Sequence, residues 1–114
     1  MPIEKRIDDL LKRMTLEEKI GQMTQVDFSV IAAPEQLNTY NPIDQARLEN
    51  AVLTHHVGSI LNAPYTPNNK AQSIETWRKM MQTVQAVAAK TRLKIPVIYG
   101  IDAIHGATYT QNSV

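Results

Sequence analysis

VGSIL (residues 57–61) and IPVIYGI (residues 95–101) are two short apolar stretches of the kind that forms buried β-strands. Pro96 lies at the start of the second stretch, where a missing N–H costs little. Between them, residues 70–92 carry apolar side chains at steps of three and four, which predicts a long amphipathic helix with one buried stripe: Ile74, Trp77, Met81, Val84 and Ala88. Strand, helix and strand in this order predict a βαβ unit whose two strands run parallel.

The N-terminal quarter predicts two helices. Residues 3–14 have charged side chains between apolar ones, and the apolar set forms a single stripe to bury: Ile3, Ile7, Leu10, Leu11 and Met14. Thr15 and Glu18 have the spacing of a capping box, in which each side chain bonds the backbone of the other residue. This box predicts the start of a second, short helix with Leu16, Ile20 and Met23 on one face.

A loop and a third helix are expected before the first apolar stretch. Residues 28–41 show no periodicity and predict a loop. Asn41 is the expected N-cap of the next helix, with Pro42 at its first position and Asp44 in its first turn. This helix should end near His56. Acidic residues at helix starts, Asp44 among them, are predicted to be capping groups rather than acids or bases.

Two parallel strands are too few for a complete domain. A closed (β/α)8 barrel takes about 250 residues, and this chain has 114. Two strands alone leave both outer edges unpaired, and the chain stops soon after the second strand without a cap or a terminal helix. We therefore expect an α/β fold, a partial TIM-type (β/α)8 barrel made of N-terminal helices plus one βαβ unit. Residues 1–114 would be the N-terminal part of an incomplete barrel domain.

Composition disfavours several classes of function. The formal net charge is +1, from 12 basic and 11 acidic side chains spread along the chain, so no nucleic-acid-binding patch is expected. No apolar run approaches the roughly 20 residues of a membrane span. The chain has no cysteine for disulfides or thiolate ligands, and no metal or cofactor is expected. The first residues lack a signal-peptide pattern, which fits a cytoplasmic protein or a periplasmic or secreted one whose leader has been removed.

Three blocks of sequence point to a family. Residues 95–106 run from an apolar strand into Gly-Ile-Asp-Ala-Ile-His-Gly, and residues 13–23 read Arg-Met-Thr-Leu-Glu-Glu-Lys-Ile-Gly-Gln-Met. The first block resembles the signature of family 3 glycoside hydrolases of the β-glucosidase type, and the second resembles the N-terminal block of that family. Residues 57–61 are similar to its first barrel strand. The three blocks follow the order of the family and together cover nearly the whole chain.

This resemblance implies a barrel that catalyses retaining hydrolysis of terminal non-reducing β-linked glucosyl residues. Such hydrolysis uses two carboxyl groups, a nucleophile and an acid/base. In the family both lie on later parts of the fold, so the resemblance implies no catalytic residue in this chain, which alone should be inactive. Asp-Ala-Ile-His-Gly at residues 102–106 favours a β-glucosidase or exo-glucanase over the N-acetylglucosaminidase branch. A β-xylosidase or another family 3 specificity remains open.

Asp102 is the substrate-binding residue that the resemblance implies. It follows the second predicted strand, at the end where barrel enzymes assemble their sites. A carboxylate accepts hydrogen bonds through two oxygens and can hold two vicinal sugar hydroxyls. His105 is a weaker candidate, because it fits a sugar contact or a bond to the loop backbone. Gly106 is expected to allow a positive φ or close packing.

Other polar and aromatic residues have plainer interpretations. His55 and His56 are adjacent at a helix end, where they suit the helix dipole better than a metal site. Trp77 lies in the apolar stripe of the 70–92 helix and is expected in the core rather than under a sugar. Tyr65 follows the first strand on the side of the expected active site, so sugar contact is an open alternative.

The expected partners are a carbohydrate, a β-glucoside or β-glucan oligosaccharide, and the remainder of the parent barrel. A different class of function also fits. The 114-residue chain would then be a non-catalytic folding unit or a self-associating barrel fragment, because exposed strand edges favour oligomers.

Overall fold

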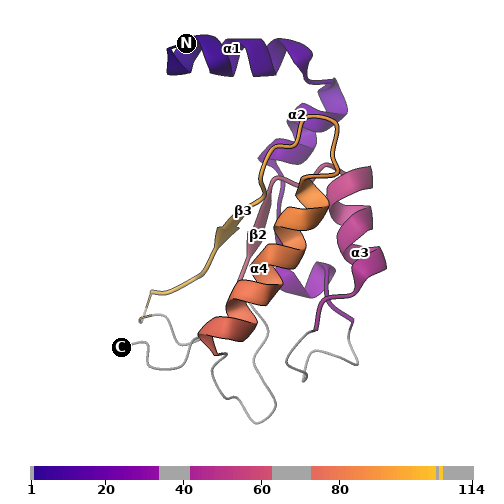
Figure 1. The fold of residues 1–114 in the computed structure, drawn as a ribbon, viewed down its shortest axis with the longest axis vertical. Helices are drawn as coiled ribbons and strands as arrows, with labels where there is room; N and C mark the ends of the chain where they lie inside the picture. Colours follow the sequence, from indigo (N-terminus) through magenta and orange to yellow (C-terminus); the bar gives the residue numbers. More distant parts are fainter. Residues whose placement is uncertain (1, 34–41, 63–72, 105, 107–114) are drawn as a thin grey trace.

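The computed structural model of the chain describes residues 2–33, 42–62, 73–104 and 106. It is an α/β fold with a parallel sheet, as expected (Figure 1). Its elements in chain order are α1 (Ile3–Arg13), α2 (Leu16–Met23), β1 (Gln25–Asp27), the 3-10 helix η1 (Phe28–Val30), α3 (Gln45–Glu49), the π-helical turn η3 (Asn50–Thr54), β2 (Ser59–Leu61), α4 (Ile74–Ala88) and β3 (Ile98–Gly100). Within the described part of the chain, no helix is both long and apolar enough to cross a membrane.

The sheet has the strand order β1-β2-β3, and both pairs are parallel. Ile60 on the central strand pairs with Val26 on one side and with Tyr99 on the other. The βαβ unit formed by β2, α4 and β3 is therefore confirmed. The expectation of only two strands was wrong, because β1 adds a third before the predicted first one. In β1, a half-buried Val26 lies between two exposed polar residues, so no apolar run marked this strand.

α1 has the predicted bounds within one residue, but most of its apolar stripe is not buried. No residue of α1 is buried, and Ile3 is 67% exposed. Figure 1 shows this helix at one end of the molecule, away from the sheet. Periodicity predicted the helix correctly. Of the expected stripe, Met14 is buried and Leu10 is half-buried, but the other three members are exposed: Ile3, Ile7 and Leu11.

α2 begins with the predicted capping box. The Glu18 N–H donates to the Thr15 hydroxyl at 3.2 Å, and the Thr15 N–H donates to a Glu18 carboxylate oxygen at 2.8 Å. The Leu16, Ile20 and Met23 side chains of this helix are exposed. The box therefore fixes the start of α2 although little apolar surface holds the helix to the core.

α3 begins later than expected. Its N-cap is Asp44, whose carboxylate accepts from the Arg47 N–H at 2.9 Å, and the expected cap, Asn41, lies outside the described residues. Ile43 was expected in the helix but instead forms an isolated bridge with Ala32. The helix continues into η3 and ends at Thr54 with His55 as its C-cap, close to the predicted end.

α4 is shorter than the predicted 70–92 helix because Ser73 caps its start and the chain leaves the helix after Ala88. The Ser73 hydroxyl accepts from the Thr76 N–H at 3.2 Å. The buried face of α4 consists of Met80, Val84, Val87 and Ala88. Ile74 was expected in this stripe, but it lies in the first turn and is 65% exposed.

The core is one cluster between the sheet, α4 and the α3–η3 segment. Its largest fully buried apolar side chains are Phe28, Ile31, Leu48, Ile60, Met80, Val52, Val84 and Val87. Trp77 and Tyr99 pack against this cluster with their rings 5.5 Å apart in an edge-to-face arrangement. Trp77 therefore packs on the core, as expected, but it is only half-buried.

Candidate functional site

The carboxyl ends of the three strands place polar residues along one edge of the sheet. Asp27 is the last residue of β1, Asn62 directly follows β2, and Asp102 lies two residues beyond β3. In the parallel register, Leu61 is the partner of both Asp27 and Gly100. Because carboxyl ends of parallel strands meet at one edge, these three residues from distant parts of the chain are brought together, and barrel enzymes build their sites at this edge.

Asp102 is exposed, and its backbone is held in place by a neighbouring strand end. Its N–H donates to the Asn62 side-chain oxygen at 2.9 Å. The ion pairs found among the described residues do not involve its carboxylate. An exposed carboxylate with a fixed backbone can accept hydrogen bonds from the hydroxyls of a ligand.

Asp27 is a fixed acceptor at the same edge. Its carboxylate accepts from the Ser29 N–H at 2.9 Å and caps η1. Its pKa is lowered, first by the Ser29 hydroxyl, then by the Ser29 backbone N–H, and also by the Asn62 side chain. A lowered pKa keeps this group ionised, which suits an acceptor and not a proton donor.

The remaining predicted site residues are only partly described. His105 and Tyr65 lie outside the described residues. Gly106 has a φ of 95°, which confirms the expected positive φ. Sequence reasoning missed Asn62 and Asp27 as members of this edge. The signal that existed was Asn62 immediately after an apolar strand, but β1 had not been recognised.

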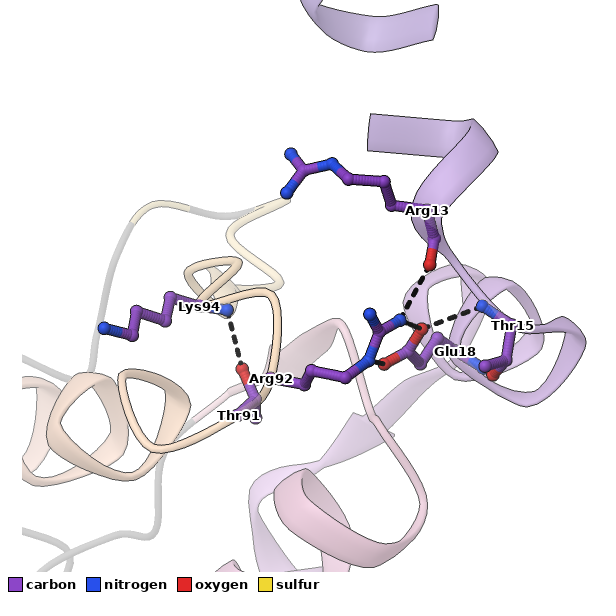
Figure 2. A network of polar contacts seen from close by, with 6 residues as sticks. All are labelled: Arg13, Thr15, Glu18, Thr91, Arg92 and Lys94. Carbon is purple, nitrogen blue, oxygen red and sulfur yellow. Dashed lines mark hydrogen bonds and ion pairs between the residues drawn. The ribbon is translucent and has the colours of Figure 1, made fainter. Parts of the chain in front are cut away.

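The amino ends of the strands carry a different kind of polar cluster (Figure 2). Arg92, in the segment between α4 and β3, forms two hydrogen bonds with the Glu18 carboxylate, at 2.6 and 3.1 Å. The Arg92 guanidinium also donates to the Arg13 carbonyl oxygen at 2.7 Å. The pKa of Glu18 is lowered, first by the Arg92 hydrogen bond and then by the Thr15 N–H. The capping box of α2 is thereby tied to a segment 74 residues further along the chain.

An apolar groove of about 680 Å³ also lies away from Asp102. It is bounded by α2, α3 and η3, and Ile20, Val26 and Val57 are among its lining residues. Neither Asn62 nor Asp102 lines it. Among the described residues, no group of three His, Asp or Glu side chains could hold a metal ion.

Comparisons with known proteins identify the family of this chain. A family profile described as "Glycosyl hydrolase family 3 N terminal domain" matches residues 15–113. The chain is 32% identical over 112 residues to the lysosomal beta glucosidase of Dictyostelium discoideum, which covers 94% of this chain and 13% of that protein. It is 31% identical over 100 residues to the periplasmic beta-glucosidase of Salmonella typhimurium, which covers 88% of this chain and 10% of that protein.

Comparison with a solved structure points to the same family. A crystal structure of a mutant exo-1,3/1,4-beta-glucanase (ExoP) from a Pseudoalteromonas species matches with a TM-score of 0.61 and 27% identity. The match covers 90% of this chain and 15% of that one. The chain thus spans a small part of the length of the relatives that it matches. Since the profile covers residues 15–113 and the fold agrees, the chain belongs to glycosyl hydrolase family 3.

Proposed function

We propose that residues 1–114 form the N-terminal part of the barrel domain of a retaining, β-glucosidase-type hydrolase. The enzyme would release terminal non-reducing β-linked glucosyl residues, with Asp102 binding the terminal sugar. The observation that carries this proposal is the exposed Asp102 carboxylate at the carboxyl edge of a parallel sheet. The β-glucosidase names of the relatives support the substrate class.

Asp102 has the chemistry that sugar binding requires. Hydroxyl groups donate hydrogen bonds, and an ionised carboxylate accepts them through two oxygens. Each such bond to a charged group is worth about 1.5–3 kcal/mol where water is excluded. Later parts of the barrel would exclude water here and supply the two catalytic carboxyl groups. Asp27 is not a candidate acid/base, because its lowered pKa is opposite to the raised pKa of a general acid.

The test uses the complete polypeptide encoded by the reading frame that contains residues 1–114. Wild-type protein should hydrolyse an aryl β-glucoside, and its downstream sequence should supply a carboxylate on a later strand as the nucleophile. Asp102→Ala should raise KM by more than about tenfold, since the charged hydrogen bonds to the sugar are lost and even one of them corresponds to about tenfold. Asp8→Ala, an exposed change on α1, is the matched control and should leave KM unchanged.

The 114-residue chain by itself should show no turnover. Activity of the purified short chain, surviving in Asp102→Ala, would show that catalytic groups lie within residues 1–114. A complete protein whose Asp102→Ala variant keeps the wild-type KM would overturn the sugar-binding role.

A second candidate function is supported by one observation. β1 and β3 are the outer strands of the described sheet, and Ile98 on β3 is 64% exposed. Exposed edges with apolar side chains favour association between copies, so the chain would be a self-associating barrel fragment without catalysis. Sedimentation of the chain discriminates between the two: concentration-dependent oligomers support this function, and a monomer at high concentration contradicts it.

A further inference from the structure

Asn62 lies between the two acidic residues of the carboxyl edge. It follows β2, the central strand, so its neighbours across the sheet are the end of β1 and the segment after β3. Asp27 pairs with Leu61, the residue before Asn62. On the other side, the Asn62 N–H donates to the Gly100 carbonyl oxygen at 2.8 Å.

Asn62 forms two hydrogen bonds with the segment that leads to Asp102. Its backbone N–H binds the Gly100 carbonyl, and its side-chain oxygen accepts the Asp102 N–H at 2.9 Å. The two bonds enclose Ile101 and fix the peptide that carries Asp102. A displacement of this peptide would move the Asp102 carboxylate as well.

The orientation of the Asn62 amide is determined by these partners. A backbone N–H can only donate, so the amide oxygen must face Asp102. The amide nitrogen then points away from Asp102. A carboxylate oxygen at position 62 could accept from the Asp102 N–H in the same way.

A simpler role for Asn62 would be to adopt the backbone conformation that the chain needs at the end of β2. Its φ is 67°, a left-handed conformation that asparagine adopts more readily than most residues. Glycine adopts the same conformation without strain. Replacing Asn62 by glycine therefore removes the side-chain bond to Asp102 and keeps the backbone conformation, which separates the two roles.

We propose that Asn62 is a positioning residue whose side-chain oxygen holds the Asp102 peptide in the geometry for sugar binding. This inference rests on the proposed function of Asp102. It assigns to the end of β2 a role in substrate affinity, although the Asn62 side chain itself need not touch the sugar.

The test compares variants of the complete protein by KM, kcat and Tm. Asn62→Gly should raise KM roughly tenfold with little change in Tm, because only the side-chain bond to the Asp102 N–H is lost. Asn62→Asp keeps an oxygen acceptor for this N–H and tolerates the same backbone conformation. It should therefore keep KM closer to the wild-type value than Asn62→Gly does.

A second comparison shows whether Asn62 acts through Asp102. In an Asp102→Ala background, Asn62→Gly should cause no further rise in KM, because effects within one network are not additive. If Asp102→Ala raises KM but Asn62→Gly does not, the positioning role is wrong and the proposed function stands. If Asp102→Ala leaves KM unchanged, both are wrong. If Asn62→Gly does not fold, Asn62→Ala takes its place, and equal KM values for Asn62→Ala and Asn62→Asp overturn the inference.

Discussion

The amino and carboxyl ends of the sheet differ in how they are closed. At the amino ends, the Gly58 N–H donates to the Gly21 carbonyl at 2.9 Å, and Arg92 binds Glu18 and the Arg13 carbonyl. At the carboxyl ends, exposed residues carry the polar groups, and the Asp102 carboxylate faces solvent. The comparison shows that contacts within the chain close one end of this sheet, whereas the other end leaves the Asp102 carboxylate exposed. Barrel enzymes assemble their sites at the second kind of end.

The two ends of the sheet also differ in how well they can accommodate an added side chain. A side chain at Gly58 would overlap the Gln22 backbone, and one at Gly21 would overlap the His55 carbonyl. At the carboxyl end, a Cβ at Gly100 would meet only the Leu61 side chain at ordinary contact distance, 3.7 Å. Substitutions should therefore affect stability at the amino end and ligand affinity at the carboxyl end.

The largest effect on stability is expected in the centre of the sheet, which supports both ends. Ile60 is fully buried on β2, whereas Ile98 on the neighbouring strand is 64% exposed. Ile60→Ala should lower the free energy of unfolding by about 4 kcal/mol. Ile98→Ala should change it by about 0.5 kcal/mol or less. Urea unfolding of the two variants measures both, and equal losses would contradict the described position of the core.

The next largest effect on stability is expected at Gly58, where the segment before β2 lies close to the backbone of α2. Gly58→Ala should lower the free energy of unfolding by about 3 kcal/mol, because backbone atoms of Gln22 cannot move aside easily. The matched control at the carboxyl end is Gly100→Ala, which should change it by about 0.5 kcal/mol or less. A well-tolerated Gly58→Ala would mean that α2 does not pack on the start of β2 as described.

A smaller, pH-dependent effect is expected from Arg92. Binding to Arg92 lowers the Glu18 pKa in the folded state, so the pair stabilises the protein at pH values above the unfolded-state pKa. This stabilisation is lost as the pH falls through the folded-state pKa. Arg92→Gln should therefore lower Tm at pH 7 and have progressively less effect below about pH 4.

Lys79→Gln is the control for the Arg92 variant. Lys79 forms an ion pair with Glu75 at 3.2 Å, and both side chains are more than 70% exposed. Exposed pairs contribute little, so this variant should keep nearly the wild-type Tm. If the two variants lose the same Tm, or if the Arg92→Gln loss does not depend on pH, the Glu18–Arg92 pair does not hold the amino end together.

Local patterns predicted the elements that carry strong periodicity. The apolar runs at 57–61 and 95–101 predicted two of the three strands, and the Thr15–Glu18 spacing predicted the cap of α2. β1 was missed because it is three residues long and mostly polar. The exposure of α1 was missed because periodicity shows that a helix has an apolar side without showing what covers it.

The candidate site, too, could be predicted only in part from the sequence. Asp102 was identified by its motif, and the structure places it at the carboxyl edge of the sheet. The contact between Asn62 and Asp102 spans 40 residues, and that between Glu18 and Arg92 spans 74. Both depend on the parallel register and on the path of the chain after each strand, which no local pattern encodes. The positive φ of Asn62 is likewise a property of the folded strand end.

The most direct measurement concerns the hydroxyls of the substrate. KM and kcat of the complete protein and its Asp102→Ala variant would be determined for aryl β-glucosides that lack one ring hydroxyl at a time. If Asp102 accepts from two vicinal hydroxyls, removal of either hydroxyl should lower kcat/KM of the wild type about tenfold or more. The same removal should leave kcat/KM of Asp102→Ala nearly unchanged. Equal losses in both proteins for every hydroxyl would show that the Asp102 carboxylate does not bind the sugar.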